Sequence, residues 1–67
     1  MIIYTKENCP FCIKAKELVT KYVEIVVGKD ITREEFLGLF PTAKTVPQII
    51  IDGTHVGGYT DLVEYLK

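Results

Sequence analysis

Apolar and polar residues follow two different periods along the chain, and together these periods predict its secondary structure. Short apolar or β-branched runs, typical of strands, occupy residues 1–5, 22–27, 48–51 and 54–56. Patterns with a helical period occupy residues 10–21, 32–40 and 59–66. The run 1–5 is almost continuously apolar, which predicts a central strand covered on both faces. The order β-α-β-α-β-β-α indicates an α/β protein with a four-stranded mixed sheet flanked by three helices.

The connections predict how these elements run. Residues 1–27 read as a strand, a helix and a strand, so the first two strands should be parallel with a right-handed crossover. Thr32 and Glu35 predict a capping box at the start of the second helix, and Pro41 ends that helix. Asp52-Gly53 is a hairpin signal, so the last two strands should be antiparallel. The apolar face of the second helix is expected to consist of Phe36, Leu39 and Phe40.

The chain has two cysteines, and both lie at the start of the first predicted helix. Cys9 takes the N-cap position and Pro10 the first helical position. Backbone N–H groups and the helix dipole stabilise a thiolate there, where cysteine pKa values fall from about 8.5 to about 3.5–7.5. Cys12 shares a helix face with Ala15 and Val19, so it should be shielded. An exposed, reactive Cys9 beside a sheltered Cys12 predicts a dithiol–disulfide couple.

Other interpretations of the residues near this motif remain open. A structural zinc site needs four ligands, and His55 is the one further soft candidate. Two inert, buried cysteines are also conceivable, although Pro10 at a strand-to-helix junction argues against them. Phe11 belongs either to the core or to an exposed lip of the site. Lys6 is either a solvated loop residue or a cation that serves a thiolate or a substrate carboxylate. His55 itself is expected to be exposed and silent.

Composition narrows the class of protein. The 67 residues, 48% of them hydrophobic, predict a single small domain over 1–67. A formal net charge of −1, with acids and bases interspersed, gives no sign of binding to nucleic acid or a membrane surface. No apolar stretch is long enough to span a bilayer, and no targeting segment precedes the first strand, so a cytoplasmic location is expected. In that reducing compartment a lone C-x-x-C pair is better explained by redox catalysis than by cross-linking.

Three motifs in order make the chain resemble the glutaredoxins of the thioredoxin superfamily, of the short bacterial or phage type. These are C-P-F-C at the first helix, T-V-P before the third strand and G-G-Y-T-D-L at the last helix. The resemblance covers essentially the whole chain and implies a thioredoxin-like fold. It implies that Cys9 attacks a disulfide and that Cys12, or glutathione itself, resolves the intermediate. It also implies a cis Pro47 beside the active site, which leaves the backbone of Val46 free to pair with an extended thiol peptide.

The same resemblance implies a glutathione site. The start of the last helix and the hydroxyl of Thr60 would bind the γ-glutamyl end, whose ammonium would meet Asp61. Lys6 and Lys44 match basic positions suited to the glycyl carboxylate. Gly58 should permit a close backbone approach, and Tyr59 should serve the site through its main chain. The expected glutathione-binding residues are Lys6, Phe11, Lys44, Thr45, Val46, Pro47, Gly58, Tyr59, Thr60 and Asp61.

The resemblance therefore predicts a dithiol glutaredoxin, a monomer without metal that glutathione reduces. Its expected substrates are glutathione mixed disulfides and protein disulfides such as that of ribonucleotide reductase. One alternative is a redoxin recharged by thioredoxin reductase. Another is a dimer that bridges an iron–sulfur cluster through Cys9 and two glutathiones, although Pro10 counts against the cluster because related cluster binders usually carry a small, flexible residue there. The sequence departs from the commonest dithiol pattern at Phe11, where tyrosine is frequent.

Overall fold

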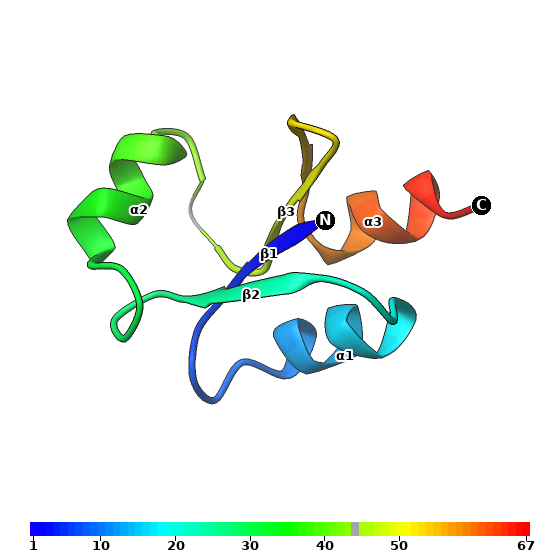
Figure 1. The fold of residues 1–67 in the computed structure, drawn as a ribbon, viewed down its shortest axis with the longest axis horizontal. Coiled ribbons are helices and arrows are strands. Elements are labelled where there is room, and N and C mark those ends of the chain that lie inside the picture. The colour runs from blue at the N-terminus through cyan, green and yellow to red at the C-terminus, as the bar shows by residue number, and fades with distance from the viewer. Residues whose placement is uncertain (44) are drawn as a thin grey trace.

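The computed structural model describes residues 1–43 and 45–67, and its elements follow the predicted order (Figure 1). In chain order they are β1 (Ile2–Thr5), α1 (Pro10–Leu18), β2 (Val23–Val26), α2 (Arg33–Leu39), β3 (Gln48–Ile51), β4 (Thr54–Gly57) and α3 (Tyr59–Tyr65). The four strands form one sheet in the order β2-β1-β3-β4. The apolar run at the start of the chain is therefore an interior strand, as predicted.

Strand directions also agree with the sequence. β1 runs parallel to β2, and β3 runs antiparallel to both β1 and β4. The β3–β4 ladder is irregular, because Ile49 pairs with Gly57 whereas Ile50 pairs with His55. One extra residue, Val56, therefore lies on β4 between the two pairs, which is the geometry of a β-bulge.

The helices divide between the two faces of the sheet. α1 and α3 cover one face, where Ile3, Ala15, Ile49 and Leu62 are all fully buried. On the other face Phe36 and Phe40 pack around Tyr4 of β1. Figure 1 shows α2, in green, standing away from the pair formed by α1 and α3. No helix among residues 1–43 and 45–67 is long and apolar enough to cross a membrane.

Two details of the helices differ from the prediction. α1 ends at Leu18 and not at Lys21, because Val19 already has an extended backbone (φ −130°, ψ 154°) and packs against the α1–α3 core. Leu39, expected in the core, is 58% exposed. The buried residues here are Phe36 and Phe40, whose ring centroids lie 5.3 Å apart and which cluster with Tyr4 of the sheet.

Candidate active site

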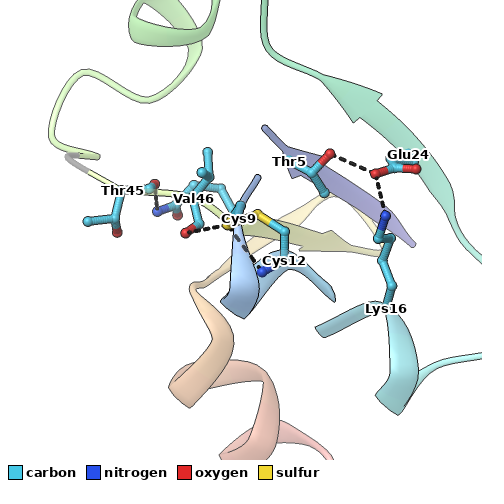
Figure 2. Close-up of a disulfide and its surroundings, with 8 residues drawn as sticks. Thr5, Cys9, Cys12, Lys16, Glu24, Thr45 and Val46 are labelled. Atoms are coloured by element: carbon cyan, nitrogen blue, oxygen red, sulfur yellow. Dashed lines mark hydrogen bonds and ion pairs between the residues drawn. A yellow bond between two sulfur atoms is a disulfide. The ribbon is translucent and has the colours of Figure 1, made fainter. Parts of the chain in front are cut away.

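The two cysteines form a disulfide where the chain leaves β1 and enters α1 (Figure 2). Cys9 is the N-cap residue, with an extended backbone, and Pro10 occupies the first turn. The backbone N–H of Cys12 donates to Cys9 Sγ at 3.2 Å, so the sulfur itself caps the helix. Cys12 is 2% exposed, whereas Cys9 is half-buried. An incoming thiol or disulfide can therefore reach Cys9, and Cys12 is sheltered behind it.

A second backbone segment lies against this disulfide. The Val46–Pro47 peptide bond is cis, and Pro47 is buried. The carbonyl oxygen of Val46 lies 3.7 Å from Cys9 Sγ (Figure 2). The chain thus presents the main chain of Val46 directly beside the sulfur that would react.

A hollow of about 570 Å³, called the main hollow below, is lined by eight of the ten residues expected to bind glutathione. They come from α1, the cis-proline segment and the start of α3: Phe11, Thr45, Val46, Pro47, Gly58, Tyr59, Thr60 and Asp61. Lys6 borders two other hollows. One, of about 550 Å³, shares Thr45 and Val46 with the first, and the other, of about 230 Å³, contains both cysteines. Lys44 lies outside the described residues.

Phe11 forms an exposed wall of the site and not part of the core. Its side chain is 54% exposed, and its ring centroid lies 5.7 Å from that of Tyr59. The ammonium of Lys14 lies 5.2 Å from the same ring centroid, within range of a cation–π contact. Of the two interpretations that the sequence left open, the lip is correct.

The start of α3 is shaped by Asp61. Its carboxylate accepts a hydrogen bond from the Gly58 N–H at 3.0 Å and so caps the helix. At Gly57, where φ is +125°, an added Cβ would collide with that carboxylate. At Gly58 it would lie 3.4 Å from the Pro47 carbonyl oxygen. A side chain at Gly57 would therefore displace the Asp61 cap, and the close approach of a ligand expected at Gly58 stays a prediction.

A polar cluster that the sequence analysis did not assign lies on the far side of the disulfide. Thr5 Oγ1 donates to Glu24 Oε2 at 2.7 Å, and Lys16 Nζ lies 2.9 Å from the same oxygen (Figure 2). The Thr5 hydrogen bond, followed by that of Lys16, lowers the pKa of Glu24. All three side chains border the small hollow that contains both cysteines. A charged residue within the apolar run 22–27 was the sequence signal for this cluster.

Two further polar residues, Gln48 and His55, border the main hollow. Gln48 received no role from the sequence, and His55, which was expected to be exposed and silent, is exposed. Across residues 1–43 and 45–67, no group of three or more His, Cys, Asp or Glu side chains is placed to hold a metal ion.

The site and the fold together define a class of protein. A cysteine pair at a helix N-terminus, facing a cis-proline segment in this βαβαββα architecture, is the arrangement of a thioredoxin-fold thiol–disulfide oxidoreductase. The glutaredoxin family model matches residues 1–56. The chain belongs to the glutaredoxin family.

Individual relatives agree. Glutaredoxin 1 of Rickettsia prowazekii is 49% identical over 74 residues, an alignment that covers 100% of this chain and 77% of the relative. Glutaredoxin 1 of Escherichia coli is 35% identical, with coverage of 98% and 91%. Among solved structures, Francisella tularensis glutaredoxin 1 complexed with cacodylate matches with a TM-score of 0.80 at 32% identity. The match covers 97% of this chain and 88% of the Francisella chain. The predicted fold and oxidoreductase class are thus confirmed.

Proposed function

We propose that glutathione is the reductant of this oxidoreductase, and that its substrates are glutathione mixed disulfides and protein disulfides. The observation that supports this most is the main hollow, which joins the backbone of Val46 to Thr60 and Asp61 beside the disulfide. Glutathione is a tripeptide with a thiol at its centre and charges at both ends, so its backbone can pair with Val46 while one charged end reaches Thr60 and Asp61.

In the proposed complex the cysteinyl part of glutathione pairs with the N–H and C=O of Val46, which brings its sulfur to Cys9. Its γ-glutamyl ammonium meets the Asp61 carboxylate. The γ-glutamyl carboxylate accepts from the Thr60 hydroxyl and from first-turn N–H groups of α3, which lack intrahelical acceptors. Lys6, which borders the neighbouring hollow that shares Val46, takes the glycyl carboxylate, and Lys44 is proposed to assist it.

The proposed reaction uses the two cysteines in different roles. The Cys9 thiolate attacks one sulfur of the substrate disulfide, and the other substrate sulfur leaves as a thiolate that takes up a proton. The Cys12 thiolate then attacks Cys9 Sγ, releases the bound substrate sulfur and forms the Cys9–Cys12 disulfide. Two glutathione molecules reduce this disulfide and leave as glutathione disulfide. For a glutathione mixed disulfide, a second glutathione resolves the intermediate on Cys9 directly, so Cys12 is dispensable.

The test is glutathione-dependent turnover of a small glutathione mixed disulfide, coupled to NADPH through glutathione reductase. We expect Cys9→Ser to abolish turnover completely. Cys12→Ser should retain it but lose the reduction of protein disulfides, since Cys12 acts only in the resolving step. Equal loss in both variants and both assays would contradict the assigned roles.

The same assay tests the identity of the reductant. A wild-type protein that glutathione cannot drive, but whose disulfide thioredoxin reductase reduces, would overturn the proposal in favour of a redoxin. The protein disulfide of ribonucleotide reductase is one proposed substrate. A monomer acting in the cytoplasm, where such reductants are maintained, fits the proposed reaction.

A further inference from the structure

Gln48 connects the active-site backbone to a histidine that the reaction above does not use. Its side chain is buried, 6% exposed. Its Nε2 donates to the carbonyl oxygen of Thr45 at 2.8 Å, and its Oε1 lies 2.7 Å from Nε2 of His55. A carbonyl oxygen only accepts, so Gln48 must turn its nitrogen toward Thr45 and its oxygen toward His55. His55 Nε2 must therefore carry a proton and donate it.

The β-bulge brings His55 to this place. Because His55 pairs with Ile50, it lies on the α2 face of the sheet, where its ring centroid is 4.6 Å from that of Phe40. Phe40 is the C-cap residue of α2, and its carbonyl accepts from the Ala43 N–H at 3.0 Å. His55 thus contacts the chain where it leaves α2 and, through Gln48, reaches Thr45 just before Val46.

We propose that His55 is a positioning residue. By donating to Gln48 it fixes the orientation of that amide, and the amide in turn holds the Thr45–Val46 backbone where a substrate thiol pairs with it. Without a donor at position 55, Gln48 loses one of its two side-chain hydrogen bonds, and its amide is held less firmly against the Thr45 carbonyl. The Thr45 carbonyl is then free to shift, and Val46, whose own carbonyl lies 3.7 Å from Cys9 Sγ, would move with it. The inference rests on the proposed pairing of substrates with Val46.

Two substitutions of His55 separate the hydrogen bond from the packing. His55→Phe keeps an aromatic ring on Phe40 but removes the donor, and His55→Gln restores a donor at a similar reach. We expect His55→Phe to raise KM for the glutathione mixed disulfide about threefold to tenfold, the range that corresponds to one lost or misdirected hydrogen bond. Its kcat should stay within about twofold of wild type, because Cys9 and Cys12 are untouched. His55→Gln should bring KM back to within about twofold of the wild-type value.

Gln48→Leu and the double variant with His55→Phe test whether the two residues act in series. If His55 works through Gln48, the double variant should be no worse than Gln48→Leu alone, so their effects should not add. Additive effects on KM would overturn the proposal. So would a wild-type KM in His55→Phe, or a rise in KM in His55→Gln as large as that in His55→Phe. Urea unfolding of His55→Phe shows whether stability has changed.

A second substrate separates this inference from the choice of reductant. A symmetrical disulfide of a short cysteine peptide, reduced with dithiothreitol as the electron donor, needs no glutathione. If glutathione turnover is absent in wild type but the peptide disulfide is reduced, the proposed reductant is wrong, and His55→Phe should still raise KM for the peptide. If wild type is active in both assays and His55→Phe matches it in both, the positioning role alone is overturned.

Discussion

The two faces of the sheet hold different parts of the active site, and they hold them with different packing. On the α1–α3 face, aliphatic residues from two helices and two strands interlock, and four of them are fully buried. On the α2 face, a single seven-residue helix contacts the sheet through Phe36 and Phe40, which retain 6% and 5% exposure. The helix that begins at Cys9 and carries Cys12 packs on the α1–α3 face. The chain that leaves the α2 face leads into the segment that presents Val46.

This difference separates the chemistry from recognition of the substrate. A helix as short as α2 is marginal by itself in water and depends on its contacts with the rest of the protein. The three rings of Tyr4, Phe36 and Phe40 meet at tilted or edge-on angles, so modest changes at this face should shift the segment that follows α2. The cysteine pair, mounted on the fully buried face, should not respond to such changes.

The largest expected effect is a loss of stability at the α1–α3 face. Leu62→Ala should lower the free energy of unfolding by about 3–4 kcal/mol, through lost burial and the cavity it leaves. For so small a domain that is a large share of the total stability. Leu39→Ala, at a 58% exposed leucine of α2, should change it by less than about 0.5 kcal/mol. Urea unfolding measures both, and similar losses would contradict the different burial of these two leucines.

A smaller change at the α2 face should act on substrate binding. Phe36→Leu removes a ring that contacts Tyr4 and Phe40, and it should cost about 1 kcal/mol of stability. We expect KM for the disulfide substrate to rise about twofold to fivefold, a shift of under 1 kcal/mol, while the rate at which an alkylating agent modifies reduced Cys9 stays unchanged.

Val19→Ala is the matched control for this prediction. Val19 packs at the end of α1 against the other core, so its truncation should reduce stability by a similar amount without raising KM. The comparison fails if Val19→Ala raises KM as much as Phe36→Leu, or if Phe36→Leu slows the alkylation of Cys9.

Local patterns in the sequence predicted most of the fold because each element carries its own signal. The capping box of Thr32 and Glu35 and the hairpin at Asp52-Gly53 each depend on a few adjacent residues, and both occur where expected. The cysteine motif is equally local, since Cys9 and the proline that follows it are enough to predict where the helix begins. The apolar run 1–5 was sufficient to predict an interior strand.

Features that depend on the packing of distant residues could not be predicted in this way. Leu39 is exposed whereas its neighbours Phe36 and Phe40 are buried, and the period alone does not reveal which of the three packs against the sheet. His55 is exposed, as expected, but its hydrogen-bond contact with Gln48 depends on a bulge in the β3–β4 ladder, and no short pattern marks that bulge. Lys6 was grouped with the glutathione-binding residues, and it borders two neighbouring hollows, one of which shares Val46 with the main hollow. That placement depends on the path of the loop after β1, which no short pattern reveals.

The smallest expected effect concerns the link between α1 and the edge strand β2. Glu24 accepts from Thr5 and pairs with Lys16 of α1, which lowers its pKa from the ordinary value of 4.5. Because the pKa is lower in the folded protein, the stabilisation is fully present above about pH 4.5 and is lost as the pH falls through the lowered value. Glu24→Gln should cost about 0.5 kcal/mol at neutral pH, since the pair is partly exposed. Urea unfolding of both proteins should show this difference shrinking in acid and in high salt. A difference that stays constant with pH would mean that shape, and not charge, joins β2 to the helix that carries the cysteines.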